Sequence, residues 1–539
     1  VTVALPQTTN AQLFGAKSLL IKNARIQDGT GRTMDGMDVM IRGKQIARIG
    51  KGLKGQMFTP VVDAEGMTLT PGLIDAWSAL GRIDESEKTA AYSTSWDTFD
   101  RYDDQLLRQA LAQGVTTIYL APGGGAGVRG HGAVIDLKPA GKHSVGELVD
   151  DQGAIAIHLG SDKTPLQRLR MFSKIRGAFR KASEYGEAKD LYEEELEEYL
   201  EKLEERRKEN EKENGKDGDK AKDAKEKKAD GKKKDGKKAG KKKGKKDDKP
   251  KPDKPAPEEP KPDKPKPEPK PEDKARAYDA NHLQQADSTR AALMPANEEG
   301  DFNRREKRKG RGGGKGKKKG KKKDSDKKDG EEEEEDELKK PERPAPDRES
   351  EEILKAINKE VAVRVTAHRS ADILNALELA DEYGLDLILV GATDAALVAH
   401  EIANADVPVI LGPVIRNMSF ENDEYRRHSM RTAGVLEEHG VTYVIGSGSN
   451  FGLSGRFIGQ HAQMAAGRNP EVDHWLPLAT SRPASILGLE KRGRVAPRMR
   501  ADLVLWTGDP GDPDATVHRV YIDGEIAWEA PKKAKAGGS

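Results

Sequence analysis

The chain of 539 residues contains no cysteine, and aromatic residues make up only 5% of it. Without cysteine there is no disulfide framework, no thiolate metal site and no cysteine nucleophile. No apolar run approaches the roughly 18 residues of a membrane-spanning helix, so we expect no membrane span. Net charge is nearly absent as well, because 94 Lys and Arg residues against 92 Asp and Glu residues leave +2. Overall charge therefore says little about partners.

What the chain has in excess is charge of both signs. Charged residues make up 35% of the sequence, against roughly 25% in ordinary domains. The excess lies between about residues 200 and 350, and the remainder has the composition of a globular protein with a large core. The length favours several domains.

The N-terminal tail, residues 1–17, has two open interpretations. Val1–Leu5 is apolar and is followed by a polar stretch with small residues, which is typical of the end of a cleaved signal peptide. This interpretation favours export or a periplasmic location. A simple polar start is the alternative, and it leaves a cytoplasmic location open.

Both ends of the chain show the alternation of apolar and polar residues that predicts strands. Ser18–Arg25 and Asp38–Ile49 lie near the N-terminus, and Ala501–Trp506 and Val517–Glu525 near the C-terminus. Asp-Gly and Arg-Gly-Lys sequences supply hairpin turns. We therefore expect one small composite β-sandwich domain from residues 18–70 and 485–530, followed by a C-terminal tail over 531–539.

Between these ends, short apolar runs alternate with helical patterns, which indicates parallel βα units and an α/β fold. The expected strands are Leu73–Ala76, Val115–Leu120, Ala133–Leu137, Ile155–Leu159, Val361–Ala367, Leu387–Val390, Val407–Leu411 and Tyr443–Ile445. The expected helices are Asp103–Gln113, Leu166–Tyr185, Ala371–Tyr383, Asp394–Asn404 and Met430–His439. Eight strands at this spacing predict a (β/α)₈ TIM barrel over residues 71–190 and 353–484.

Residues 191–352 form a charged insert in the barrel. Tyr192, Leu196, Tyr199 and Leu203 follow a heptad spacing on an acidic segment, which either pairs with a partner helix or extends the preceding barrel helix as a solvated spur. The rest is rich in Lys, Pro, Gly and Glu, a composition that predicts disorder. Its Lys blocks favour either a solvated linker or weak, salt-sensitive polyanion binding.

The stretch Thr70–Gly81 contains a Pro-Gly turn followed by a short buried strand. From Pro71 to Ala79 it reads Pro-Gly-Leu-Ile-Asp-Ala-Trp-Ser-Ala. It resembles the strand-one signature of the amidohydrolase superfamily, Pro-Gly-Leu-Ile-Asp-x-His-x-His, and Gly493–Val504 resembles the C-terminal signature of the same family. The resemblance, in particular to the imidazolonepropionase-like and prolidase-like branch, implies metal-dependent hydrolysis of carbon–nitrogen bonds in cyclic amides or peptide-like substrates.

The resemblance also implies metal ligands at the carboxyl ends of barrel strands one, four, five, six and eight. In register with the family motifs, these positions carry side chains that do not bind metal or bind it poorly. They are Trp77 and Ala79 for the two histidines of strand one, Ala156 for the modified lysine of strand four, Thr366 and Gly391 for the histidines of strands five and six, and Gly446 for the aspartate of strand eight. We therefore expect no metal cofactor and no catalytic residue.

Two histidines keep a second interpretation open. His158 and His368 each lie two residues past a vacated ligand position on neighbouring strands. With Asp75 or His131 they would hold one zinc or manganese ion, or they would act as an acid–base pair; otherwise they bond only loop backbone and water. The residues expected to line a ligand pocket are Trp77, Ser78, Thr366, His368, Gly391, Ser447 and Asn450.

Three functions follow from these patterns. The first is a catalytically degenerate amidohydrolase that binds a ligand or a partner, the partner being an intact relative or a second copy of the chain. The second is an active hydrolase with the relocated metal or histidine site. The third is a tether that binds a polyanion through the Lys-rich insert.

Overall fold

The computed structural model describes residues 17–55, 57–83, 90–160, 164–229, 338–415, 425–448 and 452–531. The chain divides into two compact units, Val1–Lys208 with Leu338–Ser539, and Glu209–Glu337. Of the second unit the structure describes only the end of one helix, so the account below concerns the first. Within the described residues, no helix is both long and apolar enough to cross a membrane.

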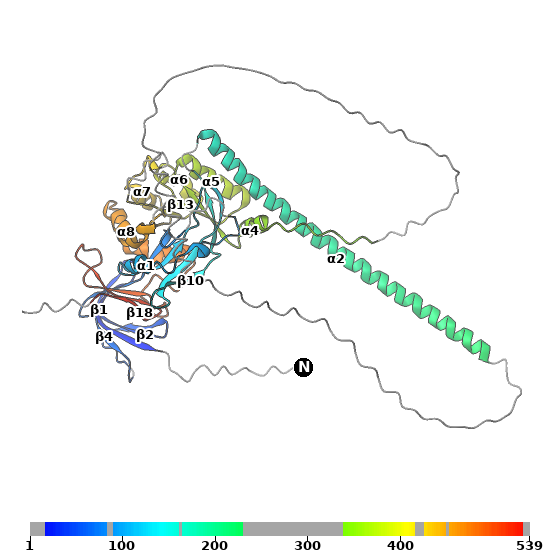
Figure 1. Ribbon diagram of the computed structural model, residues 1–539, viewed down its shortest axis with the longest axis horizontal. Helices are drawn as coiled ribbons and strands as arrows, with labels where there is room; N and C mark the ends of the chain where they lie inside the picture. Colours follow the sequence, from blue (N-terminus) through cyan, green and yellow to red (C-terminus); the bar gives the residue numbers. More distant parts are fainter. Residues whose placement is uncertain are drawn as a thin grey trace, which may run out of the picture. The chain divides into compact units, whose positions relative to one another are not determined.

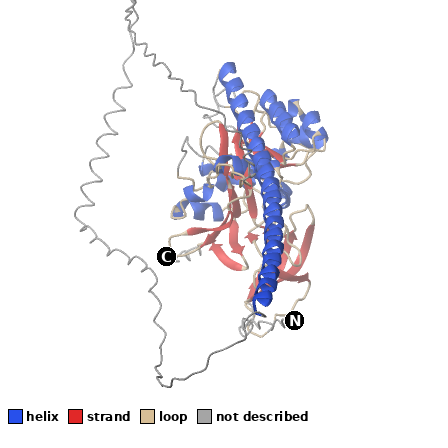
Figure 2. Cartoon of the chain, turned by 90° about the vertical axis from the view of Figure 1, so that its right-hand side faces the viewer, coloured by secondary structure: helices blue, strands red, loops and turns tan. Residues whose placement is uncertain are grey.

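A composite β domain forms from both ends of the chain, as the sequence predicts. Its sheet has the order β18-β17-β16-β5-β1-β2-β3, with β4 paired to β1. The strands are β1 (Ser18–Gln27), β2 (Thr33–Arg42), β3 (Gln45–Gly50), β4 (Val61–Asp63), β5 (Thr68–Pro71), β16 (Leu503–Trp506), β17 (Val517–Ile522) and β18 (Glu525–Glu529). Figures 1 and 2 show these strands gathered at one end of the unit, away from the barrel helices. N-terminal β5 lies between N-terminal β1 and C-terminal β16, so neither end completes the domain alone.

The turns of this domain follow the predicted chemistry. Asp523 and Gly524 join β17 to β18 with positive φ values of 56° and 74°, the backbone of a tight two-residue hairpin turn. Gly43, also at positive φ, starts the turn between β2 and β3. The buried faces of the strands supply the core of the domain, which includes Ile21, Ile41, Leu69 and Tyr521.

Seven parallel strands of the barrel lie where the sequence places them. They are β6 (Leu73–Ser78), β7 (Val115–Leu120), β11 (Ala154–His158), β12 (Ala362–Ala367), β13 (Leu387–Gly391), β14 (Val409–Leu411) and β15 (Tyr443–Ile445). β6 pairs with β7, and β11 to β15 pair in order. A parallel bridge between Ser78 and Gly448 joins the end of β6 to the segment after β15.

The third barrel position departs from the prediction. The expected strand Ala133–Leu137 exists within β9 (Ala133–Pro139), but it runs antiparallel to β7. β8 (Gly127–His131) immediately precedes it and runs antiparallel to β11, so one stretch interrupted at Gly132 connects the two halves of the barrel wall. The prediction of eight parallel βα units is therefore wrong at this position. Only six residues separate β7 from β8, and a parallel crossover needs a dozen or more.

A further strand, β10 (Val145–Asp150), pairs with β9. Helices surround the parallel part of the barrel. The helices are α1 (Asp104–Leu111), α4 (Arg348–Ile357), α5 (Ser370–Tyr383), α6 (Ala399–Asn404), α7 (Thr432–Glu438), α8 (Ile458–Gly467) and α9 (Ser481–Ile486), with short 3₁₀ turns at η1 (Ser95–Thr98), η2 (Ala395–Leu397), η5 (Gly452–Phe457) and η6 (Leu476–Ala479). The predicted helices at α1, α5, α6 and α7 are confirmed within a few residues. α8 and α9 are additional.

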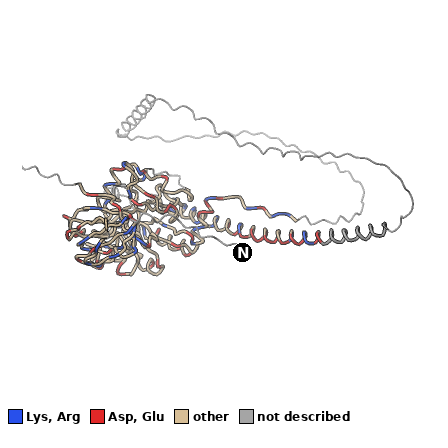
Figure 3. The backbone as a smooth tube through the Cα atoms, turned by 90° about the horizontal axis from the view of Figure 1, so that it is seen from below, with Lys and Arg blue, Asp and Glu red and all other residues tan. Residues whose placement is uncertain are grey.

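Helix α2 (Pro165–Ala229) contains both the predicted barrel helix and the predicted spur in one continuous element. Its first part packs on the barrel, where Phe179 is fully buried with its ring 5.3 Å from that of Tyr383. Beyond the barrel the helix is acidic (Figure 3), and Leu191, Leu200 and Leu203 are exposed. The spur therefore extends the barrel helix, which was one of the two predicted alternatives.

The described chain resumes at Leu338 and is fastened to α2 before it enters α4. Lys181 Nζ lies 2.6 Å from Asp347 Oδ2, and the Tyr185 hydroxyl donates to Glu351 at 2.9 Å. Asp347 also caps the N-terminus of α4. The Lys- and Pro-rich stretches of the predicted insert lie outside the described residues.

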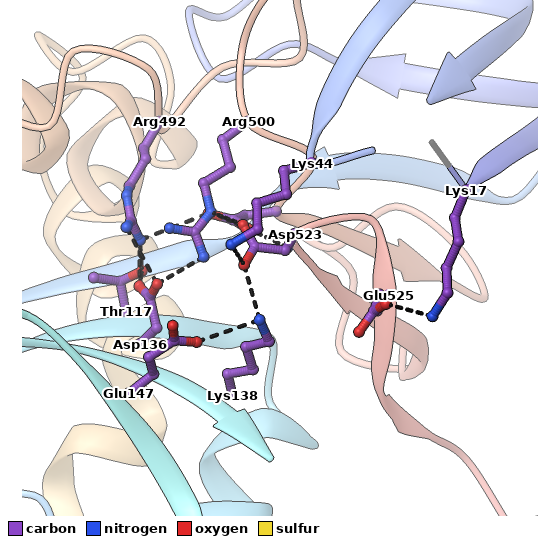
Figure 4. A network of polar contacts seen from close by, with 11 residues as sticks. Lys17, Lys44, Thr117, Asp136, Lys138, Glu147, Arg492, Arg500, Asp523 and Glu525 are labelled. Atoms are coloured by element: carbon purple, nitrogen blue, oxygen red, sulfur yellow. Dashed lines mark hydrogen bonds and ion pairs between the residues drawn. The ribbon is translucent and has the colours of Figure 1, made fainter. Parts of the chain in front are cut away.

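A buried ion-pair network joins the barrel to the β domain (Figure 4). Asp136 of β9 accepts from both Arg492 and Arg500, the latter at 2.7 Å between Nη2 and Oδ2. Arg500 also pairs with Asp502 and Asp523, and Asp523 accepts from Lys138 of β9 at 2.9 Å. Buried charges are tolerated only when paired and hydrogen-bonded, so this network fixes the junction.

Candidate functional site

The carboxyl ends of the parallel strands meet at one end of the barrel, where barrels of this kind carry their functional groups. Cross-strand pairs show which side chains share a face, because Ala156 pairs with Arg364 and His158 with Thr366. Arg364 lies against Ala76 and the ring of Tyr119 on the other half of the wall. This face of β11 and β12 is therefore the barrel interior.

The interior is filled by apolar side chains where the family resemblance implies metal ligands. The cluster consists of Ala76, Trp77, Tyr119, Ala121, Val134, Ile388, Val390, Ile410 and Val444. Trp77 is 3% exposed and occupies the first vacated position of strand one. A Cβ atom on Gly446 would lie 2.7 Å from the Cβ of Trp77, so the two residues fill one space together. Ala79, at the second vacated position, is also buried.

His368 is buried beside another vacated position. Gly391 has a φ of +83°, and a Cβ atom there would lie 2.4 Å from Cε1 of His368. The His368 Nδ1 atom lies 2.9 Å from the Thr393 hydroxyl, and its ring lies 4.4 Å from that of Tyr425. Burial lowers the pKa of His368 to about 3, so the imidazole is neutral.

His158 lies at the end of β11 under the glycine-rich loop. Its Nδ1–H donates to the carbonyl oxygen of Gly124 at 3.3 Å. Burial lowers the pKa of His158 to about 4, and the nearby Arg129 and Arg82 add to this effect. The proximity of His158 adds to the lowering of the pKa of His368, so the two predicted residues lie in the same region of the barrel mouth.

His131 does not join them. It pairs with Ile155 on β11, whereas Gly127 pairs with His158, so His131 lies three residues from the mouth, a distance of about 10 Å along a strand. Its Nε2 atom is 3.1 Å from Glu352 Oε2 of α4. The predicted metal site of His158, His368 and His131 is therefore not assembled.

Asp75 is committed to another contact. It is fully buried and accepts from the Ser447 amide at 3.0 Å, the Ser447 hydroxyl at 2.5 Å and the Trp77 amide at 3.2 Å. Burial raises the pKa of Asp75 to about 6, against the effect of these bonds. Asp75 thus ties β6 to the segment after β15, and Ser447 and Ser78 are buried in the same contact. Asn450 lies outside the described residues.

The described residues do not form a site for the divalent metal ion that the family resemblance implies. Nowhere in the described ranges do three His, Cys, Asp or Glu side chains come together in a group able to hold one. Zinc in hydrolytic sites takes three protein ligands, and the residues at the implied positions are an indole, two alanines, a threonine and two glycines. Residues 84–89, 161–163, 416–424 and 449–451 lie outside the described residues.

Sequence reasoning missed one charged residue of the interior, Arg364. Its side chain is 4% exposed, its Nη1 donates to the Ala76 carbonyl oxygen at 2.9 Å, and its guanidinium carbon lies 3.5 Å from the centre of the Tyr119 ring. A signal for it existed, because an arginine interrupts the otherwise apolar run from Val361 to Ala367.

Comparisons with known proteins agree with the fold. Residues 345–527 match the model of the amidohydrolase family. Over 58 residues, 11% of this chain, the sequence is 40% identical to the dihydroorotase of Citrifermentans bemidjiense, and the match spans 14% of that protein's length. The crystal structure of an amidohydrolase from Thermotoga maritima MSB8 is similar with a TM-score of 0.61 at 21% identity, covering 95% of this chain and 100% of that one. Residues 345–527 thus match the amidohydrolase family, and the fold of nearly the whole chain is similar to that of a solved amidohydrolase.

Proposed function

We propose that this chain is a catalytically degenerate amidohydrolase that acts as a ligand- or partner-binding scaffold. The observation that supports it is that two rings, those of Trp77 and His368, pack against the glycines at implied metal-ligand positions. The Trp77 indole packs where Gly446 leaves room, and the His368 ring packs where Gly391 leaves room. A ligating side chain at either glycine would collide with the ring beside it.

Hydrolysis in this superfamily depends on a hydroxide held and activated by the metal. The described side chains offer no ligand set for that metal, so the proposal derives no step through it. The same geometry provides a packed barrel with a mouth rimmed by loops, which is the place where proteins of this architecture bind ligands.

The alternative of an active histidine site receives less support. A general base works best when its pKa lies near the operating pH, whereas burial lowers the pKa of His368 to about 3 and that of His158 to about 4. The third ligand of a relocated metal site is also absent from the described mouth, because His131 is paired with Glu352 at the other end of β11.

The metal content of the purified full-length chain tests the proposal. The protein is produced in medium supplemented with zinc and manganese, dialysed against metal-free buffer and analysed by plasma mass spectrometry beside a known zinc hydrolase treated identically. We expect far less than one metal ion per chain. A content near one or more, with hydrolytic turnover that a chelator abolishes, would overturn the proposal and restore the active-hydrolase alternative.

For the partner-binding form of this proposal, we propose an intact amidohydrolase relative or a second copy of this chain as the partner. Light scattering of the purified chain distinguishes the second case. A mass of one chain, together with no retention of an intact relative on the immobilised protein, would leave the ligand-binding form of the proposal.

A further inference from the structure

The barrel interior holds a permanent cation, Arg364, for which the described part of the chain supplies no carboxylate. Arg364 is 4% exposed, and burial lowers its pKa. Among the described residues, the Tyr119 hydroxyl is the only ionisable group that also affects this pKa. Its Nε atom has no hydrogen-bond partner. Arg492, by contrast, is buried against a carboxylate, because it shares Asp136 with Arg500.

Burying such a charge is costly. Removing a guanidinium from water is strongly unfavourable even after relaxation, unless an opposite charge or a full set of acceptors replaces the water. The Ala76 carbonyl oxygen and the face of the Tyr119 ring replace part of the lost hydration, because a cation is attracted to an aromatic face. The guanidinium therefore still has capacity for an anionic partner.

The position of Arg364 relates it to the family site. Arg364 is the cross-strand partner of Ala156, the position where the resemblance implies the modified lysine. Arg364 also lies two residues before Thr366, the position where the resemblance implies a histidine. Its Nη1 atom bonds to Ala76, the residue before Trp77. The fixed positive charge thus lies level with one implied ligand position, Ala156, and two residues below another, Thr366.

The side chains above Arg364 suit an anion. The Thr366 side chain lies on the same interior face, is only half-buried, and its hydroxyl forms no hydrogen bond within the described structure. Arg82 and Arg129 lie near enough to His158 to influence its pKa. Of the described acids in this region, Asp75 is bonded to Ser447, and Asp394 to the Ser370 amide and Arg427.

We propose that the barrel mouth binds the oxyanion group of a small ligand, a carboxylate or a phosphate, with Arg364 as its fixed charge and the Thr366 hydroxyl as a further donor. The inference rests on the proposed function, because it gives the arginine the electrostatic role that a metal would have in an active relative. It also specifies the ligand class: an anion small enough to enter the mouth above Trp77.

Binding of inorganic phosphate and of acetate to the full-length chain tests this inference. Thermal unfolding and titration calorimetry are carried out at constant ionic strength, with chloride as the reference anion. We expect phosphate or acetate to raise the unfolding temperature more than chloride does, and the preferred anion identifies the ligand group. No preference over chloride for either anion would overturn the inference.

Two substitutions and one control locate the site. Arg364→Met should weaken anion binding about tenfold or more, the loss expected for a charge-assisted hydrogen bond. Thr366→Val, which keeps the side-chain volume and the buried charge, should weaken it several-fold and covers the case in which the arginine variant does not fold. Arg180→Met, on the exposed face of α2, should change nothing. Unchanged binding in Thr366→Val and Arg364→Met would contradict the inference.

The outcome can be separated from that of the proposed function. A metal-free chain that binds no oxyanion overturns only the anion site. A chain that contains stoichiometric metal and loses anion binding on chelation overturns both, because the metal would then be the anion-binding cation.

Discussion

Trp77 and Gly446 share one space inside the barrel, since a Cβ atom on residue 446 would lie 2.7 Å from the Cβ of Trp77 and 3.0 Å from Cγ2 of Ile410. Both belong to positions where the family resemblance implies metal ligands. The side chain that fits at position 77 therefore depends on the residue at position 446, and Trp77 packs together with the apolar side chains of the barrel interior. Reversing either position alone is expected to disturb this unit.

The first prediction concerns Gly446→Ala. The added methyl group overpacks the interior against Trp77 and Ile410, so we expect the free energy of unfolding to fall by about 1–3 kcal/mol. Denaturant titration of the variant and the wild type measures the difference.

Gly177→Ala is the matched control, because a Cβ atom at Gly177 in helix α2 meets nothing within 4 Å. This variant should be unchanged or more stable by up to about 1 kcal/mol, since alanine favours the helix over glycine. Equal effects of the two substitutions would contradict the packing relationship between Trp77 and Gly446.

The sequence predicts most of this fold because the strands follow simple patterns. Apolar runs locate the barrel strands within a few residues, and alternation with Asp-Gly turns locates the hairpins of the β domain. The direction of β9 was wrong because an apolar run carries no direction; only the short β7–β8 connection shows that no crossover helix fits there. Chain length between strands was the neglected signal.

The candidate site is predicted less completely, because its contacts join distant parts of the chain. The resemblance locates Trp77, Thr366 and Gly391, but it does not show that His368 fills the space beside Gly391. Nor does spacing show that Asp75 is bonded to Ser447, 372 residues later. The role of Arg364 could be recognised only from the structure, because its distinguishing feature is burial without a carboxylate partner among the described residues.

The second prediction concerns the buried network in Figure 4. Asp136→Asn leaves the guanidinium of Arg492, whose side chain is 8% exposed, without its main counter-charge. Removing one member of a buried ion pair costs about 3–5 kcal/mol. We expect a loss of this order in the unfolding free energy, together with loosening of the β domain from the barrel, detectable as faster hydrogen exchange in β17.

Lys17→Gln is the control for this prediction, because Lys17 and Glu525 form an ion pair with side chains 89% and 55% exposed. Exposed pairs contribute about 0–1 kcal/mol, so the variant should differ little from the wild type. A loss for Asp136→Asn no larger than that for Lys17→Gln would show that the network does not hold the junction.

The third prediction concerns the charged insert, whose Lys-rich stretches are expected to bind polyanions weakly. Replacing Glu209–Glu337, the second compact unit, by a short Gly-Ser linker should abolish retention on heparin. Binding by the wild type should fall steeply with salt, because each neutralised charge releases condensed counterions. Unchanged unfolding of the remaining unit is the control, and a shortened chain that still binds heparin would place the polyanion site on the barrel or the β domain.

The last prediction concerns acid sensitivity at His461. This residue of α8 is 3% exposed, and burial lowers its pKa to about 4, while the same side chain in the unfolded chain keeps a pKa of 6.5. Between these values the unfolded state binds a proton that the native state does not, so the unfolding free energy decreases as the pH falls. For His461 alone the decrease is about 2 kcal/mol near pH 5 relative to neutral pH.

His461→Gln should remove this contribution, whereas the other buried groups, including His158 and Asp75, affect both proteins alike. The stability difference between wild type and variant should therefore shift in favour of the variant on acidification, and a difference that is the same near pH 5 and pH 7.5 would show that His461 is not held neutral in the fold.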